Sequence, residues 1–209
     1  MSMLARLEPI IININNLSKS YTKTKGIFDI NLVFETGGVN LLIGENGSGK
    51  STLLKCIMNL LSYQGKITKK QVKIGYAPEN YIMPEYLTVH EFLLNIGRIK
   101  GIRKIALKEK CIDYFDLFQM KQYEYKPIKS LSNGTKHKVN LIQAMIHEPK
   151  ILIFDEPLVS LDFESQKRLV KYLKKESKKR LVIVSTHYPE KFKSKFTKTY
   201  YIENGRING

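Results

Sequence analysis

The chain has 209 residues, a length typical of one compact domain. Hydrophobic residues make up 43% and charged residues 26%, which argues against a largely disordered chain, and no apolar run of about 18 residues could span a membrane as a helix. The formal net charge of +16 suggests two classes of partner, nucleic acid and an anionic membrane surface.

The positive charge comes mostly from lysine and lies mostly near the end of the chain. Of the 35 basic residues only 6 are arginine, the side chain whose guanidinium group makes paired hydrogen bonds to guanine when a protein reads bases. Residues 165–209 hold 13 Lys and Arg against 3 Asp and Glu. We interpret this excess as a solvated lysine-rich surface, and we expect no nucleic-acid partner.

Apolar runs and helical spacing alternate along the chain. The polar stretch 66–73 predicts a turn, and 80–148 has no convincing strand. Strands that alternate with helices predict an α/β fold with a largely parallel sheet and a helical insert at 80–148. Predicted strands are 10–15, 30–34, 39–43, 72–76, 150–154, 181–185 and 199–202. Four helices are predicted. The first follows Gly49, and the second starts at Thr88, which forms a capping box with Glu91. The third contains Val139 and ends before Pro149, and the fourth covers about 163–179.

Residues 44–51, here called the phosphate loop, read GENGSGKS between an apolar strand and a helix. Glycines let consecutive backbone N–H groups turn toward phosphate oxygens, and the helix N-terminus adds partial positive charge. Lys50 can reach the β- and γ-phosphates, and the Ser51 hydroxyl can ligate Mg²⁺. The expected nucleotide contacts here are Gly44, Asn46, Gly47, Ser48, Gly49, Lys50, Ser51 and Thr52.

The run ILIFDEP (151–157) is an apolar strand that ends in two carboxylates. Asp155 at the strand end can bind Mg²⁺, directly or through water. Glu156, next along the chain, can take a proton from an attacking water. With the phosphate loop, this pair predicts nucleotide hydrolysis. No Asn-Lys-x-Asp sequence occurs, which disfavours a GTPase.

Five further segments stand in a characteristic order around these two motifs. They are Tyr21 in LSKSY, Glu79 in GYAPE, LSNGT at 131–135, Ser160-Leu161-Asp162, and His187 in VSTH. In this order and spacing the chain resembles ATP-binding cassette (ABC) ATPases over nearly its whole length. The segment YIENGRI (201–207) resembles that family's closing strand pair.

The resemblance implies an ATPase that uses ATP and Mg²⁺. Glu156, His187 and Lys50 would be catalytic, and Tyr21 would stack on adenine. Ser132 and Gly134 would bind the ATP held by the opposite subunit, and Asp162 would lie in the loop that contacts nucleotide. The implied Mg²⁺ ligands are Ser51, Glu79 and Asp155.

Three positions depart from the family's usual pattern. The signature reads LSNGT rather than LSGGQ, Leu158 follows DEP, and Glu79 replaces the usual Gln. Glu79 together with the following segment LTVHEFL…IKGI (87–102) resembles the drug- and peptide-export branch, including bacteriocin self-protection systems. We therefore expect an exporter.

The resemblance also implies the organisation of the chain and its partners. We expect a P-loop NTPase (RecA-like) core with an N-terminal antiparallel β region over 1–79 and 149–209, and a helical subdomain at 80–148 that carries the signature, in a single domain 1–209. A separate membrane permease, a second ABC ATPase chain and a cytoplasmic location on the inner face of the cell membrane are expected. The start, MSMLARLEPI, lacks the apolar core of a signal peptide, and Cys56 and Cys111 form no disulfide framework.

Two other functions stay open from the sequence. The charge of +16 favours an ABC ATPase that acts on DNA or the ribosome, although the chain carries neither a second cassette nor a zinc module. The other is a soluble scaffold ATPase. A nucleic-acid-stimulated ATPase rate would favour the first of these.

Overall fold

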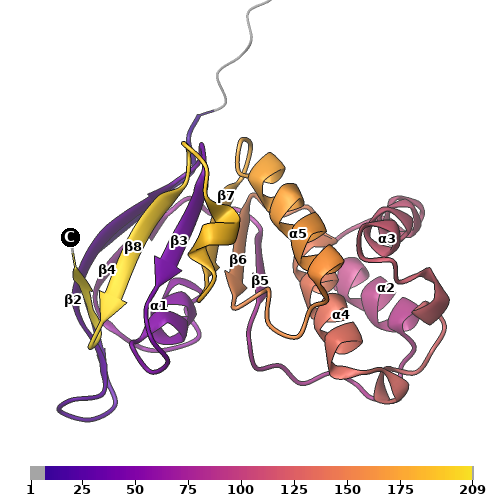
Figure 1. Cartoon of the computed structure of the whole chain (residues 1–209), viewed down its shortest axis with the longest axis horizontal. Helices are drawn as coiled ribbons and strands as arrows, with labels where there is room; N and C mark the ends of the chain where they lie inside the picture. Colours follow the sequence, from indigo (N-terminus) through magenta and orange to yellow (C-terminus); the bar gives the residue numbers. More distant parts are fainter. Residues whose placement is uncertain (1–7, 209) are drawn as a thin grey trace, which may run out of the picture.

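A computed structural model describes residues 8–208, which form two sheets with helices packed around the larger one (Figure 1). Residues 1–7, which carry most of the start considered for a signal peptide, lie outside the described residues. Over 8–208, no helix has the length and apolarity needed to cross a bilayer.

The smaller sheet is antiparallel and has the strand order β2-β1-β4. Ile12 lies opposite Phe34 and Ile14 opposite Leu32, so alternate side chains of each strand point into one buried face. This sheet is the expected N-terminal β region. Its strands are β1 (Ile11–Ser20), β2 (Gly26–Glu35) and β4 (Gln64–Lys69).

The larger sheet has the order β5-β6-β7-β3-β8-β9. Its first five strands in that order are parallel, and the hairpin β8-β9 closes the sheet with an antiparallel pair. Strands β6 and β7 are buried along their whole length, as expected for central strands covered on both faces. The strands are β3 (Val39–Ile43), β5 (Ile74–Ala77), β6 (Ile151–Asp155), β7 (Leu181–Ser185), β8 (Lys198–Glu203) and β9 (Arg206–Asn208).

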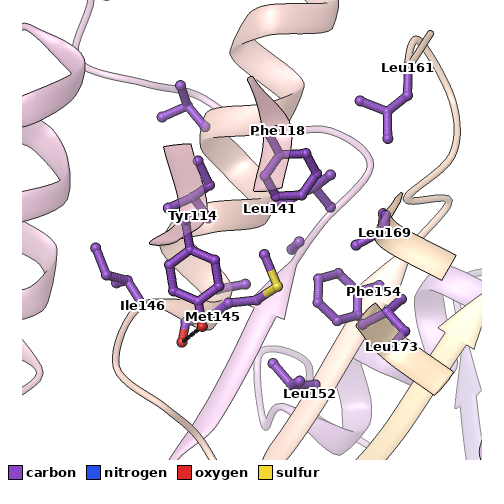
Figure 2. Packing of buried hydrophobic residues seen from close by; sticks show 14 of the residues in the cluster. Tyr114, Phe118, Leu141, Met145, Ile146, Leu152, Phe154, Leu161, Leu169 and Leu173 are labelled. Atoms are coloured by element: carbon purple, nitrogen blue, oxygen red, sulfur yellow. Dashed lines mark hydrogen bonds between the residues drawn. The ribbon is translucent and has the colours of Figure 1, made fainter. Parts of the chain in front are cut away.

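Helices cover this sheet on opposite faces. Helix α1 packs with the β region on one face, and α4 and α5 pack on the other, with α2 and α3 beyond them (Figure 1). Figure 2 shows the second layer, where Phe154 of β6 packs with Met145 of α4 and Leu173 of α5. The helices are α1 (Lys50–Ile57), α2 (Val89–Ile99), α3 (Lys104–Phe118), α4 (Asn133–Met145) and α5 (Phe163–Glu176).

The α/β class, the parallel sheet and the capping box at Thr88 are confirmed. The predicted turn at 66–73 is wrong for 66–69, because β4 covers Gln64–Lys69 and pairs with β1, whereas 70–73 do connect β4 to β5. Ile67 is the only apolar side chain in β4, so backbone pairing rather than side-chain burial makes this strand, and its sequence shows no alternation. The boundaries of the proposed subdomain at 80–148 stay a prediction.

Gly75 in β5 permits a close approach of helix α4. A Cβ at this position would lie 1.9 Å from the carbonyl oxygen of Ala144. We expect Gly75→Ala to lower the free energy of unfolding by about 1–3 kcal/mol or more, because the backbones of β5 and α4 must separate. Gly37→Ala is the control, since its Cβ would meet nothing within 4 Å and only its left-handed φ of 111° costs energy. Urea denaturation measures both; an equal loss in the two variants would contradict this prediction.

Candidate nucleotide-binding site

The phosphate loop joins the end of β3 to the start of α1. Gly47 and Gly49 adopt φ values of 84° and 113°, which side chains rarely tolerate. A Cβ on Gly49 would lie 2.6 Å from Cγ2 of Ile27, so only glycine fits between the loop and β2. Helix α1 has no side-chain N-cap bond and no acidic residue in its first turn. Its first N–H groups are therefore available to an anion, as a phosphate cradle requires.

Lys50 is the first residue of α1, and its side chain folds back over the loop. Its ammonium donates to the carbonyl oxygens of Gly44 (2.6 Å) and Glu45 (3.1 Å). The hydroxyl of Ser48 is buried and has no hydrogen-bond partner within the protein. Lys50 therefore crosslinks the phosphate loop through the loop's own carbonyl oxygens, and the Ser48 hydroxyl is left without a partner. An ammonium and a free hydroxyl at this place both fit a phosphate ligand.

Glu156 follows the end of β6 and is 3% exposed. Its N–H donates to Oγ of Ser185 at the end of β7 (3.0 Å), and that hydroxyl donates to Oδ1 of Asp155 (2.5 Å). Glu156 has a left-handed φ of 50°, which is uncommon for a residue with a side chain. Burial raises the pKa of Glu156, while His187 and Lys50, 3.7 Å from Oε1, oppose part of that rise.

His187 lies just beyond β7 and faces both Glu156 and the phosphate loop. Its Nε2 lies 2.9 Å from Oδ1 of Asn46 and 3.0 Å from Oε1 of Glu156. Its backbone N–H donates to Oε2 of Glu156 (3.3 Å). The structure therefore brings Asn46 of the phosphate loop together with His187, which lies 141 positions later in the chain, and with Glu156 between them in sequence.

A cleft of about 370 Å³ lies between the phosphate loop, the start of β2 and the loop after β5. Tyr21 stands at its mouth with 56% of its surface exposed, and the ammonium of Lys19 lies 5.6 Å from the ring centroid. An aromatic face of this kind can stack on a nucleobase. The cleft is lined by Tyr21, Lys25, Gly26, Glu45, Asn46, Gly47, Gly49, Lys50, Ser51, Thr52, Glu79 and Glu156.

Four residues of this site were not among the predicted contacts: Lys25, Gly26, Glu45 and Ser185. Lys25 lines the cleft from the turn between β1 and β2, and Ser185 links Asp155 to Glu156. Lys25 is one of 29 lysines, so nothing in the sequence distinguishes it as a residue of the site. Ser185 did carry one, because it is the polar residue that ends the apolar run LVIVS.

The expected Mg²⁺ ligands lie around the same cleft. Ser51 and Glu79 line it, and Asp155, which is 2% exposed and does not line it, directly precedes the lining residue Glu156. Over residues 8–208, no group of three His, Cys, Asp or Glu side chains could hold a metal by itself. This oxygen-donor set fits Mg²⁺, an ion that proteins usually bind by one or two side chains together with substrate phosphates.

Ser132, Gly134 and Asp162 do not line this cleft. Ser132 caps helix α4 by accepting from Thr135 N (3.2 Å). Asp162 caps α5 by accepting from Ser165 N (2.8 Å), and it forms an ion pair with Lys138 (2.8 Å) that holds its pKa well below the usual range. Nucleotide contacts by these three residues stay a prediction, since the resemblance places them against a second chain's nucleotide.

Comparison with known proteins gives a consistent set of relatives. The sequence model of the ABC transporter family matches residues 27–159. A Mycoplasma pneumoniae protein named as an ABC transporter ATP-binding protein is 32% identical over 85% of this chain and 59% of its own length. The ABC transporter ATP-binding protein NatA of Bacillus subtilis is 30% identical over 88% of this chain and 80% of its own.

Solved structures agree with this result. A structure of an ATP-binding subunit of an ABC transporter superposes with a TM-score of 0.85 at 25% identity, covering 95% of this chain and 88% of its own. A dimeric ATP-binding cassette bound to ADP and Pi superposes equally well at 20% identity, covering 95% of this chain and 97% of its own, and this match supports the fold alone. The chain spans 59% of the Mycoplasma relative and 30% of another relative, an ABC transporter G family member of Dictyostelium discoideum.

The raised pKa of Glu156 predicts a pH-dependent difference between the wild type and Glu156→Gln. An ionised Glu156 must lose its hydration on folding, so its charge opposes folding at pH values above its raised pKa. We expect Glu156→Gln to be the more stable protein at pH 7–8. The advantage should shrink as the pH falls from the raised pKa through 4.5, the ordinary value, because below that pH the wild-type carboxyl is protonated in both states. Urea denaturation across this range tests it; a difference that is independent of pH would show that Glu156 titrates normally.

Proposed function

This chain belongs to the ABC transporter family, and we propose that it is the ATP-binding and ATP-hydrolysing subunit of an ABC transporter. The observation that carries the proposal is the meeting of the phosphate loop and Glu156 at one cleft, with Nε2 of His187 within 3.0 Å of both Asn46 and Glu156. Three backbone segments from different strands supply an anion cradle, a proton acceptor and a group that orients the acceptor. A hydrolase of nucleoside triphosphates needs these three functions.

The geometry supports a division of labour among these residues. Lys50 exchanges its bonds to the Gly44 and Glu45 carbonyls for the β- and γ-phosphates of ATP. Glu156 accepts the proton of the attacking water, and its raised pKa suits that role at neutral pH. His187 orients Glu156 through the backbone bond to Oε2 and reaches the γ-phosphate from Nε2. Mg²⁺, held by Ser51 and Asp155 with Glu79 nearby, would neutralise phosphate charge when bound.

A second cassette would complete the site. Ser132 and the amide groups around Gly134 open helix α4, as an anion site requires, yet they lie outside this chain's own cleft. We propose that they contact the ATP of a second ABC ATPase chain, a copy or a paralogue. ATP then closes two cassettes onto each other, and hydrolysis lets them reopen.

A permease on a separate chain would convert this closure into transport. A hollow of about 690 Å³ is lined by Pro78, Tyr81, Met83, Phe92 and Ile96, with Asn140 and Gln143 among the polar residues. Ile82 at its rim is fully exposed and Tyr86 nearby is 84% exposed. We propose that this apolar surface receives a helix of the permease, which would hold the chain at the inner face of the cell membrane. Glu79 and LTVHEFL (87–93) favour an exporter.

Glu156→Gln tests the proposed function directly. Without the proton acceptor, ATP should bind but not be hydrolysed, so the variant should lose about 10²–10⁴-fold in ATPase rate. It should also accumulate as an ATP-bound dimer, whereas the wild type with ADP should be monomeric. Phosphate release and size-exclusion chromatography measure the two effects.

The matched control is His90→Gln. His90 lies on α2 with its Nδ1 2.8 Å from Oε1 of Glu124, outside the cleft, so this variant should keep its ATPase activity. A monomer at every ATP concentration in Glu156→Gln would favour a paralogue partner. ATP hydrolysis undiminished by Glu156→Gln would contradict the assignment of the base.

Glu79 should make the response to Mg²⁺ steeper than a glutamine would. An ionised Glu in the cleft with Glu156 and the ATP phosphates adds a negative charge that only the bound metal compensates. We expect the ATPase rate to rise more steeply with Mg²⁺ in the wild type than in Glu79→Gln, which should retain substantial activity. Superimposable Mg²⁺ titrations of the two proteins would rule out a role for Glu79 as a metal-linked sensor.

A further inference from the structure

Helix α4 carries a row of polar side chains that faces strand β5 and the loop after β6. His137, Asn140 and Gln143 follow each other at a spacing of three residues, which places them on one face of the helix, and His147 lies just past its end. His137, Asn140 and His147 are each no more than 5% exposed. Buried polar groups of this kind need partners, and all of these find backbone carbonyls.

Three of the carbonyls lie along the outer edge of β5, two within the strand and one, that of Pro78, just after it. Asn140 Nδ2 donates to Pro78 O (2.9 Å), Gln143 Nε2 to Tyr76 O (2.8 Å), and His147 Nε2 lies 3.2 Å from Ile74 O. Strand β5 is the last strand of the larger sheet and pairs only with β6. Its Lys73 carbonyl accepts from Lys150 on the β6 side (3.0 Å), so the carbonyls of 74, 76 and 78 point the other way, toward α4.

The fourth carbonyl lies beside the proposed catalytic base. His137 Nε2 is 3.1 Å from Pro157 O, in a fully buried contact. Burial lowers the pKa of His137, so at neutral pH the ring is uncharged and its one N–H serves as the donor. Pro157 has a locked φ, so a bond that holds its carbonyl also holds the backbone immediately after Glu156.

The bonds made by His137 and Asn140 therefore hold carbonyls that are adjacent in sequence to the two acids of the cleft, Glu156 and Glu79. Pro78 precedes Glu79, and Pro157 follows Glu156. On α4, His137 and Asn140 are one turn apart and only a few residues from Ser132 and Gly134. Gly134 itself packs on the loop after Glu156, because a Cβ there would lie 2.6 Å from Ser160 O.

We propose that His137 and Asn140 are positioning residues, which hold the backbone of Glu156 and Glu79 from the helix that presents the signature. The part that concerns catalysis rests on the proposed function. Through these bonds, a shift of α4 as the signature meets a second chain's nucleotide moves both acids of the chain's own cleft. Gln143 and His147 anchor the same helix farther from the cleft and have no acid beside their acceptors.

The test compares bonds near the cleft with a matched bond far from it. His137→Leu and Asn140→Leu remove the donors and replace them with a branched apolar side chain, and His147→Leu removes an equivalent bond at the far end of the row. We expect the first two to lower kcat about tenfold or more, with the KM for ATP changed less than about threefold, because substrate binding at the phosphate loop is untouched. His137→Gln, which keeps a donor, should recover most of kcat.

The control should separate positioning from stability. His147→Leu should lower the unfolding temperature about as much as the other two yet leave kcat within about twofold. Amide hydrogen exchange gives a readout that needs no ATPase activity. Asn140→Leu should speed exchange at residues 79–81, and His137→Leu at 158–160, whereas His147→Leu should leave both segments unchanged.

Several outcomes would overturn the proposal. An unchanged kcat and unchanged exchange in His137→Leu and Asn140→Leu would do so, and so would equal losses of kcat in His147→Leu. If the wild type hydrolyses no ATP, the proposed function fails. Exchange at 79–81 and 158–160 then still decides whether α4 positions the two loops.

Discussion

Parallel strands place their carboxyl ends at one edge of a sheet, and four loops of this chain meet there for that reason. The phosphate loop follows β3, Glu79 follows β5, Glu156 follows β6 and His187 follows β7. No single one of these loops can bind and hydrolyse a nucleotide. The strand pairing alone brings residues up to 141 positions apart into contact at one site, and every other feature of the site depends on it.

The cleft concentrates charge where water is largely excluded. Lys50, Asp155 and Glu156 are each no more than 6% exposed, and Glu156 also carries a left-handed backbone. Each of these features opposes folding unless a partner offsets it, so they are expected at sites of function rather than in an ordinary core. Burial of the apolar layers around β6, β7 and α5 offsets the unfavourable free energy of these buried charges (Figure 2).

The sequence predicted the cleft better than it predicted the elements around it. Residue type and spacing tie four parts of the site to their chemistry, so the sequence alone predicts them: Gly44–Ser51, Asp155, Glu156 and His187. Strand β4 could not, because it has only Ile67 to bury and owes its existence to pairing with β1. The contacts of His137 and Asn140 were equally hidden, since an amide or imidazole on a helix carries no sign of which carbonyl lies opposite.

The row of donors on α4 has a consequence for the solubility of the protein. An edge strand with free acceptors is a template on which a strand of another chain can add, and parallel sheets are especially exposed to this while they fold. In this chain the acceptors at 74, 76 and 78 are already occupied by Asn140, Gln143 and His147. The row of polar side chains on α4, which includes the proposed positioning residue Asn140, therefore also closes one border of the sheet against aggregation.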